Sequence, residues 1–194
     1  FKHSVGGLAT GLASFYQNQE SLWVGWCGLP SNALDTPKRS ELESVLLRCF
    51  NSLPTFLSKK DVRQFYAGFC NKTIWPLFHY FPNYTTYSQN TWDAYKRVNK
   101  QFAQSLLKII EPDDIIWIHD YHLFLLPRLL REELPKAHIG FFLHIPFPSY
   151  EIFRLLPWRQ EILEGILGAD LIGFHTYDYV RHFDSSVRRI LGHE

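Results

Sequence analysis

Three short apolar segments in the second half of the chain, separated by helical patterns, constrain the fold most strongly. Ile115–Ile118, Ile139–Leu143 and Leu171–Phe174 are apolar runs of strand length. Such runs are typical of strands buried on both faces of a parallel sheet. The stretches beside them repeat apolar residues at helical spacing, as expected for crossover helices: 123–134, 149–156, 159–167 and 178–191. We therefore predict an α/β fold, a parallel sheet with helices on both faces.

The first half of the chain has weaker patterns. We predict a strand over Leu22–Trp26 and an exposed loop over Leu29–Arg39. Helices are expected over 41–50, 58–71 and 91–110, and an irregular stretch over 75–90. In the helix that begins near Ser58, with Ser58 as its N-cap, one face carries Val62, Phe65, Tyr66 and Phe69.

Composition excludes several classes of protein. The 194 residues are 46% hydrophobic, which suits one packed domain, and 20 basic against 19 acidic residues leave a net charge of +1. That charge provides no basic field for a nucleic acid or an anionic membrane. No apolar run is long enough to span a bilayer, and no signal peptide is visible. The cysteines Cys27, Cys49 and Cys70 lack paired spacing, so we expect buried, reduced thiols in a cytoplasmic protein.

Histidines follow all three predicted strands. His119, His144 and His175 come directly after them, and Asp120 follows the first. Ligands of open parallel sheets bind outside the carboxyl ends of the strands, so these side chains form a candidate site. The alternative for each histidine is a packed structural role. Metal binding by His119 and His122 is a further alternative, but no zinc-type ligand spacing occurs, and we predict no metal.

A glycine pair lies near the start of the chain. Gly6 and Gly7 precede a helical pattern, so their backbone could approach an anionic ligand or simply allow tight packing. The surrounding sequence matches neither the dinucleotide-binding nor the P-loop fingerprint. The glycine pair alone leaves both interpretations open.

Six sequence blocks in fixed order add a family resemblance. They are Gly6–Ala9, Trp23–Trp26, Trp75–Tyr80, Trp92–Asn99, Asp113–His122 and Gly140–Pro148. Together they resemble the N-terminal half of the trehalose-6-phosphate synthase family of retaining glucosyltransferases, over essentially the whole chain. The resemblance implies that residues 1–194 form the Rossmann-like, acceptor-binding domain of a two-domain GT-B glycosyltransferase. It also implies that the chain begins after the family's first strand and adjoining arginine, and lacks the C-terminal nucleotide-binding domain.

The resemblance also implies a reaction. Glucose would pass from UDP-glucose to the anomeric hydroxyl of glucose 6-phosphate with retention, giving α,α-trehalose 6-phosphate, without cofactor or metal. The 194 residues alone are expected to be inactive, because the basic residues that neutralise the donor diphosphate lie in the second half. The implied roles are catalytic for His144 and Asp120, acceptor-binding for Tyr66, Trp75 and Asp120, and donor-binding for Gly6, Gly7 and His144.

Two alternative functions stay open at this point. One is a related synthase that uses another phosphorylated acceptor, such as glycerol 3-phosphate. The other is a non-catalytic regulatory module related to the synthases. The expected partners are the two small-molecule substrates, with no nucleic acid and no membrane. A homo-oligomer and a trehalose-synthesis complex are the candidate assemblies.

Overall fold

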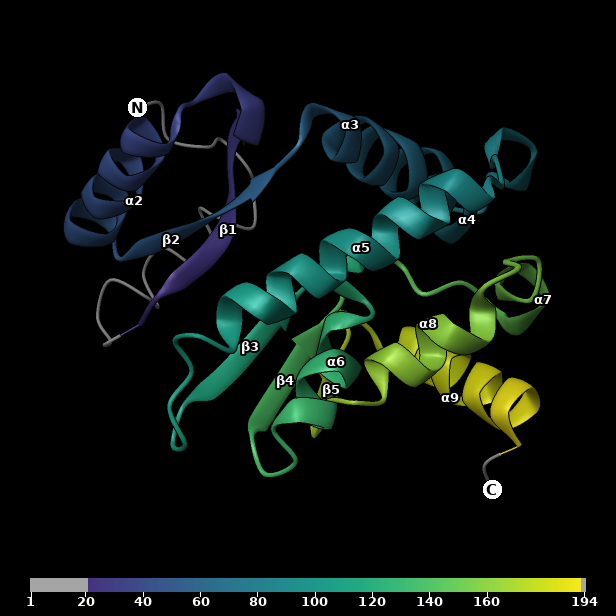
Figure 1. Cartoon of the computed structure of the whole chain (residues 1–194). Helices are drawn as coiled ribbons and strands as arrows, with labels where there is room; N and C mark the ends of the chain where they lie inside the picture. Colours follow the sequence, from purple (N-terminus) through teal and green to yellow (C-terminus); the bar gives the residue numbers. More distant parts are fainter. Residues whose placement is uncertain (1–20, 193–194) are drawn as a thin grey trace. The chain divides into compact units, whose positions relative to one another are not determined.

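The computed structural model describes residues 21–192, which divide into two compact units joined between Ser58 and Lys59. Each unit contains its own parallel sheet (Figure 1). No helix among the described residues is long and apolar enough to cross a membrane. The prediction that residues 1–194 form one domain stays a prediction.

The first unit is a β-α-β arrangement. Strands β1 (Trp23–Pro30) and β2 (Ser52–Leu57) pair in parallel, and α2 (Thr36–Phe50) connects them after the short 3₁₀ turn η1 (Ser31–Ala33). The carboxylate of Asp35 caps α2 by accepting a hydrogen bond from the Lys38 N–H at 3.0 Å.

The structure of this unit differs from the sequence predictions. The helix begins at Thr36 within the predicted loop, because an aspartate cap followed by Pro37 starts a helix. Strand β2 was missed, because Pro54 within its run argues against a strand. Cys49 is exposed, since α2 has no buried residue, and Cys27 is half-buried, so of the three cysteines predicted to be buried only Cys70 is.

The second unit contains a three-stranded parallel sheet in the order β3-β4-β5 (Figure 1). Its elements, in chain order, are β3 (Ile115–His119), η4 (Tyr121–Leu123), α6 (Leu126–Glu133), β4 (His138–Phe142), α7 (Tyr150–Phe153), α8 (Arg159–Ile166), β5 (Leu171–Gly173) and α9 (Tyr177–Leu191). The predicted alternation of parallel strands and helices is confirmed. Consecutive right-handed crossovers place α6 and α8 on the same face of the sheet, where they contact each other.

The prediction that these strands are buried on both faces was wrong. Ile116 and Ile118 are buried, but Ile115 is 81% and Trp117 45% exposed, and Leu171 on β5 is 73% exposed. Alternate residues of a strand point to opposite faces, and α6 and α8 cover only one of them. The length of the apolar runs therefore predicted the strands correctly, but their continuous apolar character wrongly indicated burial on both faces.

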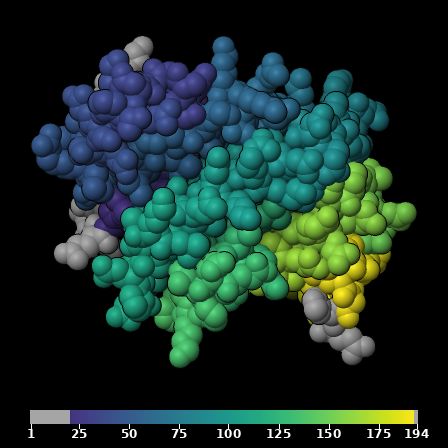
Figure 2. Space-filling view, in the orientation of Figure 1, coloured from purple at the N-terminus to yellow at the C-terminus, as the bar shows by residue number. Residues whose placement is uncertain are grey.

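Helix α5 (Gln89–Leu106) packs against the second unit's other helices and ends four residues before the predicted boundary. Figure 2 shows its side chains, in teal, lying against the green side chains of the later helices. Trp92 stacks on Trp158 with ring centroids 5.2 Å apart, and Tyr95 lies 4.5 Å from Phe69. These ring contacts pack α5 against Phe69 and Trp158.

One helical segment, residues 59–78, changes its winding. It consists of α3 (Lys59–Asp61), the π-helix η2 (Val62–Ile74) and α4 (Trp75–Phe78), and the 3₁₀ turn η3 (Pro82–Tyr84) follows. The N–H of Trp75 donates to the carbonyl of Cys70, five residues earlier, as π-helical winding requires. The predicted helix is thus confirmed at its start but continues through Phe78, into the stretch predicted to be irregular.

Candidate functional site

The carboxyl edge of the β3-β4-β5 sheet brings the three predicted histidines together. Nδ1 of His119 lies 3.1 Å from Nε2 of His144, and the rings of His144 and His175 are 5.6 Å apart in an edge-on arrangement. The predicted convergence at one edge is therefore confirmed. Within residues 21–192, no three His, Cys, Asp or Glu side chains are arranged to hold a metal ion.

Burial controls the charge of the two hydrogen-bonded histidines. It lowers the pKa of His119 to about 4, with a further contribution from charge on His144. It also lowers the pKa of His144, helped by charge on His175. At neutral pH both rings of the pair are therefore neutral, so they act through hydrogen bonds.

Asp120 has an unusual backbone conformation. Its φ of 71° and ψ of 170° fall in a region that is essentially reserved for glycine. A side chain in this region costs about 1–3 kcal/mol, and such strain concentrates at functional sites. Two hydrogen bonds, one to the last residue of β4 and one to His144 just after it, hold the residue there. The Asp120 N–H donates to the carbonyl of Phe142 at 2.8 Å, and its Oδ1 accepts from the N–H of His144 at 3.2 Å.

Helix α5 supports the turn that follows Asp120. The buried Tyr95 hydroxyl donates to the carbonyl of Tyr121 at 2.8 Å and accepts from the N–H of Phe124 at 2.9 Å. The buried Asn99 amide donates to the carbonyl of His122 at 3.1 Å. These bonds determine the path of the turn, which allows the strain at Asp120 to persist.

The electrostatics of Asp120 reflect its position at a half-covered edge. Burial raises the pKa of its carboxyl group. Charge on His122 and the hydrogen bonds from the N–H groups of Tyr121 and His144 oppose that rise. Burial in turn lowers the pKa of His122, and the nearby Asp120 carboxylate opposes that shift. The side chain is thus partly withdrawn from water, where hydrogen bonds to a ligand are strengthened.

The π-helical winding of η2 decides how Tyr66 and Trp75 are related. They are nine residues apart, which in an α-helix, at about 100° per residue, would place them on opposite faces. A π-helix has about 4.4 residues per turn, so nine residues make close to two full turns and bring both to one face. Both are accordingly exposed, Tyr66 by 41% and Trp75 by 43%. Tyr66 therefore differs from Phe65 and Phe69, which the sequence places on the same helix face and which are buried.

Tyr66 reaches the turn that follows Asp120, whereas Trp75 contacts its own helix. The ring of Tyr66 stacks on His122 with centroids 5.5 Å apart. The ring of Trp75 stacks on His79 at 4.0 Å. Of the predicted site residues, Asp120 and His144 are hydrogen-bonded to each other, and Tyr66 stacks on His122, two residues after Asp120. Trp75 lies on the same helix face as Tyr66.

Asn71 also contacts this turn, and sequence reasoning missed it. Its Oδ1 accepts a hydrogen bond from the Tyr121 hydroxyl at 3.4 Å. It lies five residues after Tyr66, which is close to one turn of a π-helix. Under an α-helical reading the same spacing points it well away from Tyr66. The five-residue spacing has a meaning only once the π-helical winding is known, so the sequence alone carried no signal for Asn71.

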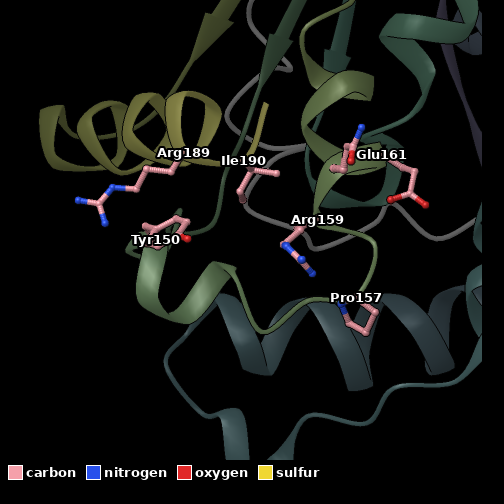
Figure 3. Close-up of a pocket in the computed structure, with 7 residues that line it drawn as sticks. Tyr150, Pro157, Arg159, Glu161, Arg189 and Ile190 are labelled. Carbon is pink, nitrogen blue, oxygen red and sulfur yellow. The ribbon is translucent and has the colours of Figure 1, made fainter. Parts of the chain in front are cut away.

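Two further features lie apart from this site. Gly6 and Gly7 are outside the described residues. A cavity of about 280 Å³ involves none of the predicted site residues and is lined by Tyr150, Pro157, Arg159, Gln160, Glu161, Arg189 and Ile190 (Figure 3). There the guanidinium of Arg189 lies 4.7 Å from the ring centroid of Tyr150 and forms an ion pair with Glu151 at 3.7 Å.

Comparison with known proteins identifies the family. The family model described as glycosyltransferase family 20 matches residues 1–194. The chain belongs to glycosyltransferase family 20. The UDP-forming alpha,alpha-trehalose-phosphate synthase A of Dictyostelium discoideum is 48% identical over 193 residues, covering 100% of this chain and 26% of the relative.

Solved structures agree with this family-20 assignment. An alpha,alpha-trehalose-phosphate synthase (UDP-forming) from Burkholderia xenovorans, in complex with glucose-6-phosphate, superposes with a TM-score of 0.82 at 33% identity, covering 97% of this chain and 41% of that one. An E. coli structure named for trehalose-6-phosphate and bound with UDP-2-fluoro glucose gives 0.83 at 34% identity, covering 98% and 41%. The chain thus spans from about a quarter to two fifths of these relatives.

Family-20 membership confirms the sequence resemblance and the Rossmann-like α/β fold of the N-terminal half of a GT-B glycosyltransferase. It assigns no role to individual residues. The roles of Asp120, His144, Tyr66, Trp75 and the glycine pair therefore stay predictions, as do a cytoplasmic location and the candidate assemblies.

Proposed function

We propose that this chain forms the acceptor side of a retaining glucosyltransferase that makes α,α-trehalose 6-phosphate from UDP-glucose and glucose 6-phosphate. Its support is family-20 membership together with relatives named as UDP-forming synthases. One solved relative holds glucose-6-phosphate and another UDP-2-fluoro glucose. None of the relatives named above is described as using another acceptor or as a regulatory module. Because the chain spans 26–41% of those relatives, the activity is proposed for the complete gene product.

The conformation of Asp120 carries the proposal. Glycine would occupy φ 71° and ψ 170° without strain, so a side chain at this position is kept at a cost in stability and for what its carboxylate does. The aspartate instead holds a carboxylate at the carboxyl edge of a parallel sheet, bonded to the N–H of His144 at 3.2 Å. We assign this carboxylate to accept hydrogen bonds from hydroxyl groups of glucose 6-phosphate.

The exposed face of η2 suits the same ligand. Tyr66 and Trp75 contribute aromatic rings, which stack well on the apolar faces of a sugar, and Asn71 between them contributes an amide. Tyr66, stacked on His122, would lie near the 6-phosphate. Asp120 would then orient the sugar ring so that its anomeric hydroxyl faces the donor.

His144 would face the donor glucose, and the loop of Gly6 and Gly7 would pass beside the donor diphosphate. The anomeric oxygen of the acceptor forms a bond to C1 of the donor glucose while the bond from C1 to the diphosphate oxygen breaks on the same face. The leaving phosphate oxygen takes the acceptor proton. Such a reaction needs positioning and charge stabilisation rather than the paired carboxylates of a glycosidase.

The test uses the complete gene product with UDP-glucose and either glucose 6-phosphate or glycerol 3-phosphate. We expect a disaccharide phosphate only from glucose 6-phosphate, with both anomeric linkages α by NMR coupling constants. Preference for glycerol 3-phosphate, inverted stereochemistry at the donor carbon, or binding of glucose 6-phosphate without any transfer would each overturn the proposal.

A further inference from the structure

His119 is the hydrogen-bonding neighbour of His144. It ends β3, where its backbone pairs with Phe142 of β4, two residues before His144. The two rings are 5.3 Å apart between centroids and tilted by 39°, with Nδ1 of His119 facing Nε2 of His144 at 3.1 Å. The indole of Trp117, 4.6 Å from the His119 ring, packs against it from the same strand. His119 is therefore held at a defined place and angle.

The chemistry of two neutral imidazoles gives this contact a consequence. Each neutral ring has one N–H and one bare nitrogen, so the bond requires one ring to donate and the other to accept. Whichever ring donates, Nε2 of His144 is engaged by His119, so the tautomers of the two rings are coupled and the orientation of the His144 ring is defined. Within residues 21–192, Nδ1 of His144 has no hydrogen-bond partner, so it is the ring atom left for a ligand.

His175 does not share this role. Its ring meets that of His144 edge-on at 5.6 Å and that of Phe142 at 5.1 Å, and it is exposed. These are ring contacts, which limit the rotation of His144 without selecting a tautomer. Of the two histidines beside His144, His119 is the one whose ring forms a hydrogen bond with it.

We propose that His119 is a positioning residue that holds the His144 ring in one orientation and couples the His144 tautomer to its own, so that Nδ1 of His144 is presented to the donor sugar. This inference rests on the donor-side role of His144 in the proposed function. His119 itself does not touch the substrate. It acts by removing the flipped orientation of the His144 ring and by tying its tautomer to that of His119 before the substrate binds, which is a form of preorganisation.

The test compares side chains that place an amide differently. In His119→Asn the amide occupies the place of Nδ1 and can keep the bond to His144, whereas in His119→Gln it occupies the place of Nε2, and His119→Leu has no polar group. We expect kcat of the complete gene product to fall about 2- to 12-fold in the Gln and Leu variants and to stay within about 2-fold of wild type in the Asn variant. The KM for glucose 6-phosphate should be unchanged in all three. His138→Leu, on an exposed residue at the opposite end of β4, serves as the control.

A second measurement is independent of activity. In protein labelled with ¹⁵N-histidine, two-bond ¹⁵N–¹H correlations identify the tautomer of each ring, and His144→Gln assigns the His144 signals. We expect the same balance of His144 tautomers in wild type and the Asn variant, and a changed balance in the Gln and Leu variants, because the bond at Nε2 of His144 is lost there. An unchanged balance of tautomers in all of them, or equal impairment of the Asn and Leu variants, would overturn the inference. Absence of transfer by wild type would overturn only the proposed function, because the tautomer still reports on His119.

Discussion

Replacing Asp120 by alanine and by glycine separates backbone strain from side-chain function. Both changes remove the carboxylate and its bond from the N–H of His144, so they differ only in the β-carbon. At φ 71° and ψ 170° a β-carbon destabilises the folded state by about 1–3 kcal/mol. Glycine in turn stabilises the unfolded chain by about 0.4–1 kcal/mol, because it has more conformational freedom there. The glycine variant should therefore be the more stable of the two by about 0.5–2 kcal/mol.

The assay is urea unfolding of the complete gene product, followed by tryptophan fluorescence. The matched control is Lys100, which is exposed within α5, where alanine should be more stable than glycine by about 0.5–1 kcal/mol. The order of the two variants should thus reverse between the two positions, and both Asp120 variants should be equally poor in glucosyl transfer. An alanine variant at position 120 that is as stable as the glycine variant would refute the strain argument and the reason for assigning function to this residue.

Three further predictions concern the same edge of the sheet. Asp120→Asn should lower kcat/KM for glucose 6-phosphate by about 10- to 150-fold, because a charged hydrogen bond contributes about 1.5–3 kcal/mol. Circular dichroism should show an unchanged fold, and Asp113→Asn is the control. Wild-type kinetics in the Asp120→Asn variant would contradict the assignment. His144→Ala should lower kcat while calorimetry shows nearly unchanged binding of glucose 6-phosphate, and loss of that binding would move His144 to the acceptor side. The folded pKa of His119, about 4, lies below its ordinary value of 6.5, so the unfolded chain takes up the proton first as pH falls. The contribution of neutral His119 to the free energy of unfolding is complete above pH 6.5 and is lost between pH 6.5 and pH 4. Urea unfolding should therefore show a smaller loss of stability between pH 7 and 4.5 in His119→Asn than in wild type.

Much of the fold followed from local pattern. Apolar runs at Ile115–Ile118 and Leu171–Phe174, with helical spacing between them, were sufficient to predict a parallel sheet, because parallel strands require crossovers. Strand β2 was not predicted, because it contains a proline. The π-helical winding of η2 could not be predicted either, because its residues suit an α-helix equally well. Winding depends on which side chains the neighbouring elements bury, as with Phe65 and Phe69, and that is a property of packing.

The sequence by itself determined which residues gather at the functional edge. A histidine at each strand end and an aspartate after the first had to meet there, since carboxyl ends of parallel strands share one edge. Only the tertiary structure decided what these residues can do. It placed Asp120 in a strained conformation, held by β4 and by the buried Tyr95 and Asn99, and it set His119 at hydrogen-bond distance from His144. Those relations join elements distant in the sequence, so they arise from the packing of α5 and β4 around one turn rather than from any local pattern.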